Sequence, residues 1–258
     1  MNTLQNLRVL LVQVRPDNVT RDHEFAQFLK QTGFLEKQVV RVDALNEVLS
    51  ENVLEGIDAV VIGGSGDYLI SQGDIPEVVE AIGELSRQTR KNRIPLLGIC
   101  FGAQIMTTAF GGKVELLENK AETGTFMVTK NTQATSCPIL SDLPNSFLAQ
   151  LGHKDHLTKL PEGAVNLADS ALSDVQIYTF PNEPVYAVVF HPELDREGII
   201  YRLNYYAQQY HLSQEVLDEL FSGLKSTPEA SNVLRNFFTH VVLGKRYYPS
   251  TNQTPKSE

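Results

Sequence analysis

Short, mostly apolar runs alternate with amphipathic segments along the first half of the chain. The runs have the length of strands, and the segments between them gather apolar residues on one helical face, as Phe25, Phe28 and Leu29 do. The predicted strands are LRVLLVQV (7–14), QVVRVDAL (38–45), DAVVIGG (58–64) and IPLLGIC (94–100). The predicted helices are HEFAQFLKQTGF (23–34), a stretch over about 76–93, and AQIMTTAFGG (103–112). Strands buried on both faces that alternate with helices predict an α/β fold, a doubly wound and mostly parallel sheet flanked by helices.

The pattern changes after Gly112. From 113 to 190 the runs are shorter and more β-like: KVELL, TGTFMVTK, VQIYTF and VYAVVF. We expect a small antiparallel β excursion there, followed by a return to the main sheet. Beyond His191 three helical patterns follow: REGIIYRLNYYAQQY, SQEVLDELFSGL and EASNVLRNFFTHVV. We therefore predict one domain over 1–210 and a C-terminal helical extension with a polar tail over 211–258. The C-terminal helices either cover the domain or dock a partner.

Composition narrows the class of protein. The chain has 258 residues, 42% of them hydrophobic and 21% charged, which suits a packed globular core. The formal net charge of −9 disfavours binding to nucleic acid phosphates. Two cysteines are too few for a secreted disulfide scaffold, and no apolar run has the length of a membrane span or a signal peptide. We expect a cytoplasmic protein with no membrane partner.

Cys100 stands where a predicted buried strand meets a predicted helix, in the sequence GICFG (98–102). This is the spacing of a nucleophile elbow, in which glycines two residues before and after the nucleophile avoid clashes in a sharp turn. The start of the following helix would favour a thiolate, and the Phe101 N–H would be placed to bind an oxyanion. The spacing alone leaves open a buried, inert cysteine. Cys137, beside a proline, has no such setting and is expected to be structural.

A second glycine-rich segment, Gly63 to Asp67, directly follows the third predicted strand. Neighbouring strand ends would bring it beside Cys100, where its N–H groups could form the second half of an oxyanion hole. An ordinary glycine-rich turn is the alternative. A phosphate-binding loop is less favoured, because the segment lacks both the Lys-Ser/Thr of a P-loop and the full dinucleotide-binding spacing.

His191 closes the strand VYAVVF, and Glu193 follows two residues later across Pro192. A histidine at a strand end can take the thiol proton of Cys100 and pass it to a leaving amine. A carboxylate beside it would hold the imidazole tautomer. On its own, His-Pro-Glu is more often a loop feature. A metal site is less favoured, because neither this segment nor HKDH (153–156) has the spacing of a zinc site.

Four segments together resemble class I glutamine amidotransferases, especially the glutaminase domain of GMP synthases. They are VVIGGSGD, LLGICFGAQIMTTAFGGKVE, LGHKDHLTKLPEG and VFHPE, which occur in the family's order within residues 7–210. The resemblance implies a flavodoxin-like glutaminase fold over 1–210.

The resemblance also implies roles for individual residues. It implies a catalytic triad of Cys100, His191 and Glu193 that forms a γ-glutamyl thioester from glutamine. We expect no cofactor and no metal. The implied oxyanion hole consists of Gly64, Ser65, Gly66 and the Phe101 N–H. The implied substrate contacts are Gln104 for the glutamine, and His153, Lys154 and Asp155 for its amino-acid head.

The chain departs from the family pattern at three points. Lys154 stands where the family often has glycine, and Ser65 replaces a proline common in the oxyanion loop. The Ser-Gly-Gly-x-Asp-Ser loop of an ATP-pyrophosphatase domain does not occur in the sequence. A synthetase that uses the ammonia would then be a separate polypeptide.

Three functions stay open on the sequence. The first is a glutaminase subunit or stand-alone amidotransferase-like enzyme. The second is a γ-glutamyl peptidase or hydrolase, which would cleave an amide with a larger leaving group and need no synthetase partner. The third is a non-catalytic regulatory protein on the same fold, disfavoured by the intact Cys100, His191 and Glu193.

Overall fold

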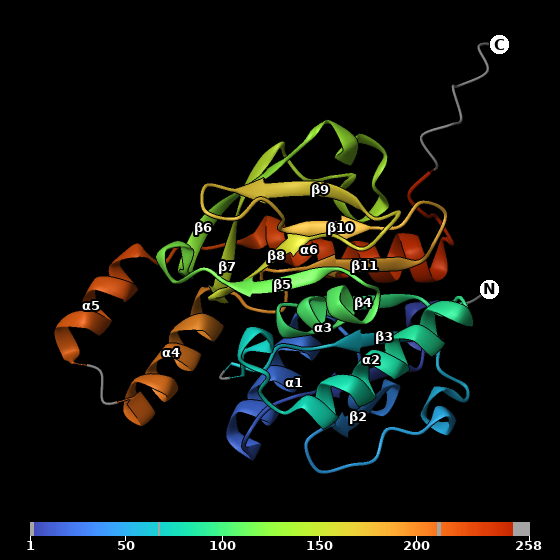
Figure 1. Cartoon of the computed structure of the whole chain (residues 1–258), viewed down its shortest axis with the longest axis horizontal. Helices are drawn as coiled ribbons and strands as arrows, with labels where there is room; N and C mark the ends of the chain where they lie inside the picture. Colours follow the sequence, from blue (N-terminus) through green and yellow to red (C-terminus); the bar gives the residue numbers. More distant parts are fainter. Residues whose placement is uncertain (1–2, 67, 211–212, 250–258) are drawn as a thin grey trace.

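The four apolar runs of the first half form parallel strands that make up one half of the main sheet, with β2 at its edge. The computed structural model describes residues 3–66, 68–210 and 213–249 (Figure 1). The parallel strands are β1 (Val9–Gln13), β2 (Val39–Asp43), β3 (Ala59–Ile62), β4 (Leu96–Ile99) and β11 (Val185–Val188), in the order β2-β1-β3-β4-β11. Every residue of β1, β3, β4 and β11 is buried, so the prediction of a doubly covered parallel sheet is confirmed.

Helices pack on both faces of this sheet and at one edge of the molecule. They are α1 (Asn18–Thr32), α2 (Pro76–Lys91), α3 (Phe101–Ala109), α4 (Arg196–Tyr210), α5 (Gln214–Gly223) and α6 (Pro228–Asn236), which leads into the π-helix η8 (Phe237–Leu243). Alternate residues of β1 divide between two hydrophobic cores. Leu11 packs in the core that includes residues of α1, α6 and η8, while Leu10 packs in the core that includes residues of α2 and α3.

The antiparallel part is larger than the small excursion that the sequence predicts. The strands β10 (Ile177–Thr179), β9 (Val165–Ser170), β6 (Glu122–Lys130) and β7 (Ser146–His153) continue the main sheet beyond β11 in that order. A separate pair, β5 (Lys113–Leu116) and β8 (Asp155–Lys159), lies beside it. The sequence pattern does not predict β7, β8 or β9, whose burial lacks a regular alternation.

The C-terminal helices occupy two different places. Residues of α6 and η8, among them Phe237 and Val241, are fully buried in the larger core. Helices α4 and α5 lie at one edge of the molecule (Figure 1). The domain boundary expected at residue 210 stays a prediction, and residues 250–258 of the expected tail lie outside the described residues. Within the part of the chain that the structure describes, no helix has both the length and the apolar character to cross a bilayer.

Candidate active site

Cys100 occupies a strained turn between β4 and α3. Its φ of 50° and ψ of −106° lie outside the usual regions for a residue with a side chain. A Cβ at Gly102 would lie 2.3 Å from the carbonyl oxygen of Ile62, and one at Gly98 would lie 2.8 Å from the carbonyl carbon of Gly102. Both flanking glycines are therefore required by the close approach of backbone at this turn.

His191 and Glu193 meet Cys100 because β11 lies directly beside β4. The two strands are parallel, with Val188 opposite Ile99, so both polypeptide segments leave the sheet at the same edge. Nδ1 of His191 donates to Oε1 of Glu193 at 2.8 Å, and all three side chains are buried. The Gly152 carbonyl oxygen of β7 also lies near Cys100, 4.0 Å from its Sγ.

The electrostatics of the three residues favour an imidazolium at position 191. Burial acts to lower the pKa of His191, but the charge of Glu193 and the neighbouring Cys100 outweigh it and raise the pKa to about 9. Burial acts to raise the pKa of Glu193, while His191 and Arg202 hold it down at about 2. The carboxylate is thus charged at neutral pH and stabilises a protonated ring.

The glycine-rich loop after β3 lies against Cys100, as the order of the strands predicts. The N–H of Gly102 donates to the carbonyl oxygen of Gly63 at 3.1 Å. A Cβ at Gly64 would lie 3.6 Å from Cβ of Cys100 and 3.1 Å from Cε1 of His191. Gly66 has a φ of +94°, and Ser65 is buried with its hydroxyl 3.4 Å from the Tyr68 carbonyl oxygen. Asp67 lies outside the described residues.

The residues expected to hold the substrate head lie where Gln104 of α3 meets the turn between β7 and β8. The carbonyl oxygen of Asp155 accepts from Nε2 of Gln104 at 3.2 Å and from Nδ1 of His153 at 3.0 Å. The Asp155 carboxylate accepts from the backbone N–H of Ser71 at 3.0 Å and from its hydroxyl. Lys154 is exposed, while Gln104, His153 and Asp155 are buried. The structure joins these three in one network, and their role in substrate binding stays a prediction.

Glu122 is a buried carboxylate that the local sequence does not single out. Its Oε2 accepts from Nε2 of His153 at 3.0 Å and from Gln176 at 2.8 Å, and its Oε1 accepts from Ser170 at 2.7 Å. Both ring nitrogens of His153 therefore face oxygen acceptors. The carboxylate fixes the orientation of the ring beside the 152–155 turn.

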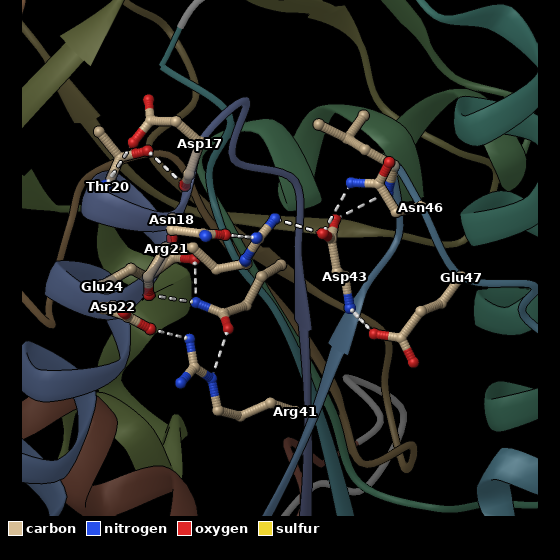
Figure 2. A network of polar contacts seen from close by, with 12 residues as sticks. Asp17, Asn18, Thr20, Arg21, Asp22, Glu24, Arg41, Asp43, Asn46 and Glu47 are labelled. Atoms are coloured by element: carbon tan, nitrogen blue, oxygen red, sulfur yellow. Dashed lines mark hydrogen bonds and ion pairs between the residues drawn. The ribbon is translucent and has the colours of Figure 1, made fainter.

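Arg15, at the end of β1, is a second buried charge next to the site. A Cβ at Gly64 would lie 3.1 Å from its Nη2, so the guanidinium packs on the glycine-rich loop. Glu24 of α1 holds it, with Oε1 accepting from Nη2 at 2.7 Å and from Nε at 3.0 Å. Figure 2 shows Glu24 at one end of a polar network that joins α1 to β2 through Arg21, Arg41 and Asp43. The loop beside Cys100 thus rests on a guanidinium that is itself anchored.

Helix α4 contributes two further polar groups. Nη1 of Arg202 donates to Oε1 of Glu193 at 3.4 Å, and the Tyr206 hydroxyl accepts from Nη1 of Arg15 at 3.3 Å. Nothing in the local sequence of REGIIYRLNYYAQQY distinguishes these side chains from a solvated helix face, so only the structure reveals their position.

Cys137 lies apart from this chemistry. It is fully buried in the larger hydrophobic core, and burial raises the pKa of its thiol to about 12. Among the residues that the structure describes, no group of three or more His, Cys, Asp or Glu side chains is arranged to hold a metal ion.

Comparisons with known proteins identify the family to which the chain is similar. A family model described as glutamine amidotransferase class-I matches residues 19–198. The chain is 30% identical over 172 residues to the glutamine-hydrolysing subunit of the GMP synthase of Methanocaldococcus jannaschii, an alignment that covers 67% of this chain and 82% of that protein. It is 33% identical over 136 residues to a GMP synthase of Thermosipho melanesiensis, covering 53% of this chain and 24% of that protein.

Two solved structures share the fold. A glutamine amidotransferase from Thermotoga maritima superposes with a TM-score of 0.71 at 18% identity, over 92% of this chain and 98% of that one. A glutamine amidotransferase from Methylobacillus flagellatus gives a TM-score of 0.63 at 17% identity, over 99% of this chain and 100% of that one. At these identities the likeness is one of fold.

Proposed function

Since the chain belongs to the class I glutamine amidotransferase family, we propose that it hydrolyses the γ-amide of glutamine, with Cys100 as the nucleophile. The observation that carries this proposal is the meeting of Cys100, His191 and Glu193 at one edge of the sheet. A thiol on a strained strand-to-helix turn, an imidazole beside it and a carboxylate 2.8 Å from that imidazole form the arrangement of an activated nucleophile.

In the first half of the reaction, the sulfur of Cys100 attacks the γ-carbonyl carbon of glutamine. His191 holds the proton of the thiol and delivers it to the departing nitrogen, so that the C–N bond breaks, ammonia leaves and a γ-glutamyl thioester remains. The developing oxyanion would be bound by the N–H groups of Phe101 and of the Gly64–Gly66 loop. The closeness of Gly64 to Cys100 supports this assignment.

In the second half, His191 removes a proton from water, and the water oxygen attacks the thioester carbon. The C–S bond breaks, glutamate leaves, and the proton returns to the sulfur. The sum is glutamine plus water to glutamate plus ammonia. Throughout, Glu193 holds Nδ1–H of His191, which keeps Nε2 directed to the reacting atoms.

The substrate head would bind near Gln104 and the turn that carries His153, Lys154 and Asp155. The buried network of Gln104, His153 and Asp155 gives this turn a fixed backbone on which the α-amino and α-carboxyl groups could be recognised. The free ammonia would serve a separate synthetase, as the similarity to glutamine-hydrolysing subunits of GMP synthases suggests.

The experiment is a substrate panel on the purified protein, with glutamate and ammonia followed from glutamine. We expect the wild type to release glutamate and ammonia in equal amounts. We expect Cys100→Ser to keep the fold and to release neither. Cys137→Ser serves as the matched control and should keep wild-type turnover, because the buried Cys137 thiol has its backbone neighbours in Ile139 and Leu140, which are not among the proposed site residues. Full activity of Cys100→Ser would contradict the mechanism. An increase of turnover on adding an ammonia-using synthetase would support the partner.

Lys154 favours one second candidate, a γ-glutamyl hydrolase for substrates with a larger leaving group. Its exposed ammonium stands beside the turn expected to bind substrate, where it could pair with an additional carboxylate. The panel therefore includes γ-glutamyl dipeptides. Fast turnover of the dipeptides and slow turnover of glutamine would replace the first candidate with this one, and Lys154→Gly would then raise KM for the dipeptides.

A further inference from the structure

Two side chains of α4 reach the candidate active site from outside the strands that carry it. Arg202 and Tyr206 are four positions apart, a spacing that places side chains on the same face of a helix. Nη1 of Arg202 donates to Oε1 of Glu193 at 3.4 Å, the same oxygen that accepts from His191. One helix therefore contacts the carboxylate of the proposed triad and, through Tyr206, the side of the glycine-rich loop.

The Tyr206 hydroxyl packs directly against Gly66 of this loop. A Cβ at Gly66 would lie 2.0 Å from the Tyr206 hydroxyl oxygen and 3.0 Å from Nη1 of Arg15. The hydroxyl also accepts from Arg15, whose guanidinium packs against Gly64. Tyr206 and Arg15 together form the surface on which the proposed oxyanion loop rests.

Arg202 is buried in a way that packing alone does not account for. It is 4% exposed, and its Nε and Nη2 have no hydrogen-bond partner in the described part of the chain. A buried guanidinium with unpartnered donors costs stability that an apolar side chain of similar volume would not cost. Nη1 of Arg202 donates to Glu193. The contact with this carboxylate explains why a charged residue occupies the buried position.

We propose that Arg202 and Tyr206 are positioning residues, which hold the triad carboxylate and the oxyanion loop in register with Cys100. The placement of α4 then governs catalysis, because a shift of this one helix would disturb both halves of the site. The inference rests on the proposed function of Cys100, His191 and Glu193.

Arg202 and Tyr206 act on different groups of the site, so their substitution should affect kcat and its pH dependence differently. Arg202 restrains Glu193 and also places a cation near the His191 imidazolium. Tyr206 acts on the loop through its hydroxyl, which accepts from Nη1 of Arg15. Among the residues that the structure describes, the charged and titratable side chains around His191 and Glu193 include Cys100 just before α3, Arg15 after β1, His23 and Glu24 on α1, and Arg202 and Tyr206 on α4.

The test measures kcat and KM for glutamine against pH in Arg202→Met and Arg202→Lys. In Arg202→Met we expect kcat to fall roughly 10- to 100-fold from misplacement of the carboxylate. The basic limb of the kcat profile should move to higher pH, because removal of a nearby cation favours the imidazolium. Arg202→Lys keeps the charge and should restore the position of the limb and part of kcat.

The matched control is Arg196→Met. Arg196 is an exposed arginine on the same helix, and its Nε donates to the Leu224 carbonyl oxygen rather than to the site. Its removal takes the same charge from α4 and should leave kcat and the basic limb at their wild-type values. A folded Arg202→Met protein with the kcat and the pH limb of the wild type would overturn the proposal for Arg202.

Tyr206→Phe provides the second, independent measurement, and it carries the test if Arg202→Met does not fold. We expect kcat to fall roughly 10-fold or more with KM and the basic limb unchanged, since the variant loses only the hydroxyl that supports the loop. Unchanged kcat in Tyr206→Phe would overturn its part of the proposal.

Alkylation of Cys100 by iodoacetamide separates this inference from the proposed function. If the wild type does not hydrolyse glutamine but Arg202→Met changes the pH dependence of alkylation, the glutaminase proposal fails and the positioning role of Arg202 stands. If the wild type hydrolyses glutamine and neither variant alters kcat or the pH profile, the positioning proposal fails alone.

Discussion

At the scale of single residues, His191 lies between the carboxylate of Glu193 and the sulfur of Cys100. Both neighbours favour the protonated ring and outweigh the effect of burial, so the pKa of His191 is raised to about 9. A ring that is protonated up to this pH can supply the proton that ammonia needs in order to leave. Turnover should therefore hold through neutral pH and decline as the pH rises through about 9.

Glu193→Gln tests this account of the histidine. Loss of the carboxylate removes the main favourable charge beside His191, so the pKa of the ring should fall and the basic limb of kcat should move to lower pH. The direction is opposite to that expected for Arg202→Met. By analogy with triads that lose their carboxylate, kcat itself should drop by up to about 10⁴-fold. A pH–rate series on the variant measures both effects, and a basic limb that stays in place would contradict the assignment of the limb to His191.

Gly102→Ala tests the turn that carries Cys100, the proposed nucleophile. A Cβ there would lie 2.3 Å from the Ile62 carbonyl oxygen, which is backbone and has no free direction in which to move. We expect a loss of about 1–3 kcal/mol in the free energy of unfolding and a large fall in kcat, because Cys100 would shift. Gly223→Ala, where a Cβ would meet nothing within 4 Å, should change stability by less than about 0.5 kcal/mol. Denaturant unfolding of both variants provides the comparison.

The residues that the sequence indicated are those whose chemistry depends on neighbours in the chain. The local spacing is enough to indicate a role for Cys100, which stands between two glycines. It also indicates a role for His191, which stands two residues before Glu193. Arg15, Glu122 and Arg202 do not, because each acts on the site through residues distant in sequence. A charged side chain in a helical pattern resembles a solvated one until tertiary contacts bury it.

At the scale of elements, the carboxylate of Glu122 joins three strands and the segment that leads into a fourth, around the turn beside Cys100. Its partners are His153 on β7, Ser170 on β9 and Gln176 just before β10, while Glu122 itself begins β6. Antiparallel strands with mixed burial rely on such shared polar groups for their register. The antiparallel part thus supports the site by fixing His153.

Glu122→Gln should weaken this part of the molecule. The new amide group would present a donor to side chains that are themselves donors, which leaves at least one buried group unpaired. We expect a loss of about 1–3 kcal/mol in the free energy of unfolding and a raised KM for glutamine. The matched control is Glu115→Gln on β5, a partly exposed glutamate that should be nearly neutral. Equal stability of the two variants would contradict the supporting role of Glu122.

Strands were predictable where both faces are buried, and less so where they are not. The continuous apolar runs of β1, β3 and β4 directly indicate strands that are buried on both faces. The segments that form β7, β8 and β9 mix polar and apolar residues without a regular period, since they themselves carry buried polar residues such as Gln150 on β7 and Asp155 on β8. Their pairing is set by partners far along the chain, which a local pattern does not carry.

At the scale of the whole molecule, the helices α6 and η8 complete the larger core. Phe237 and Phe238 pack edge-on to each other, and Phe238 contacts Phe28 of α1 and Phe34 beyond it. The C-terminal helices therefore differ in their contribution to stability. Those after residue 227 belong to the main core, whereas α5 packs mostly in a small cluster with α4.

Phe237→Ala and Phe221→Ala measure this difference. Phe237 is fully buried in the larger core, so its truncation should cost about 3–5 kcal/mol in the free energy of unfolding. Phe221 of α5 is only partly buried in the small cluster, and its truncation should cost clearly less. Thermal unfolding of both variants gives the ranking. An equal or larger effect at Phe221 would mean that α4 and α5 are integral to the core.

The position of β11 has a consequence for how the protein is made. Among the described strands β11 comes last in sequence, yet it lies between β4 and β10, in the middle of the main sheet. A nascent chain that has emerged only to residue 180 therefore holds two half-sheets with open facing edges, which invite pairing with other chains. When residues 185–191 leave the ribosome, one strand closes both edges and carries His191 to Cys100. Completion of the main sheet and the approach of His191 to Cys100 are then the same event, and an unfinished chain carries the thiol without the histidine proposed as its base.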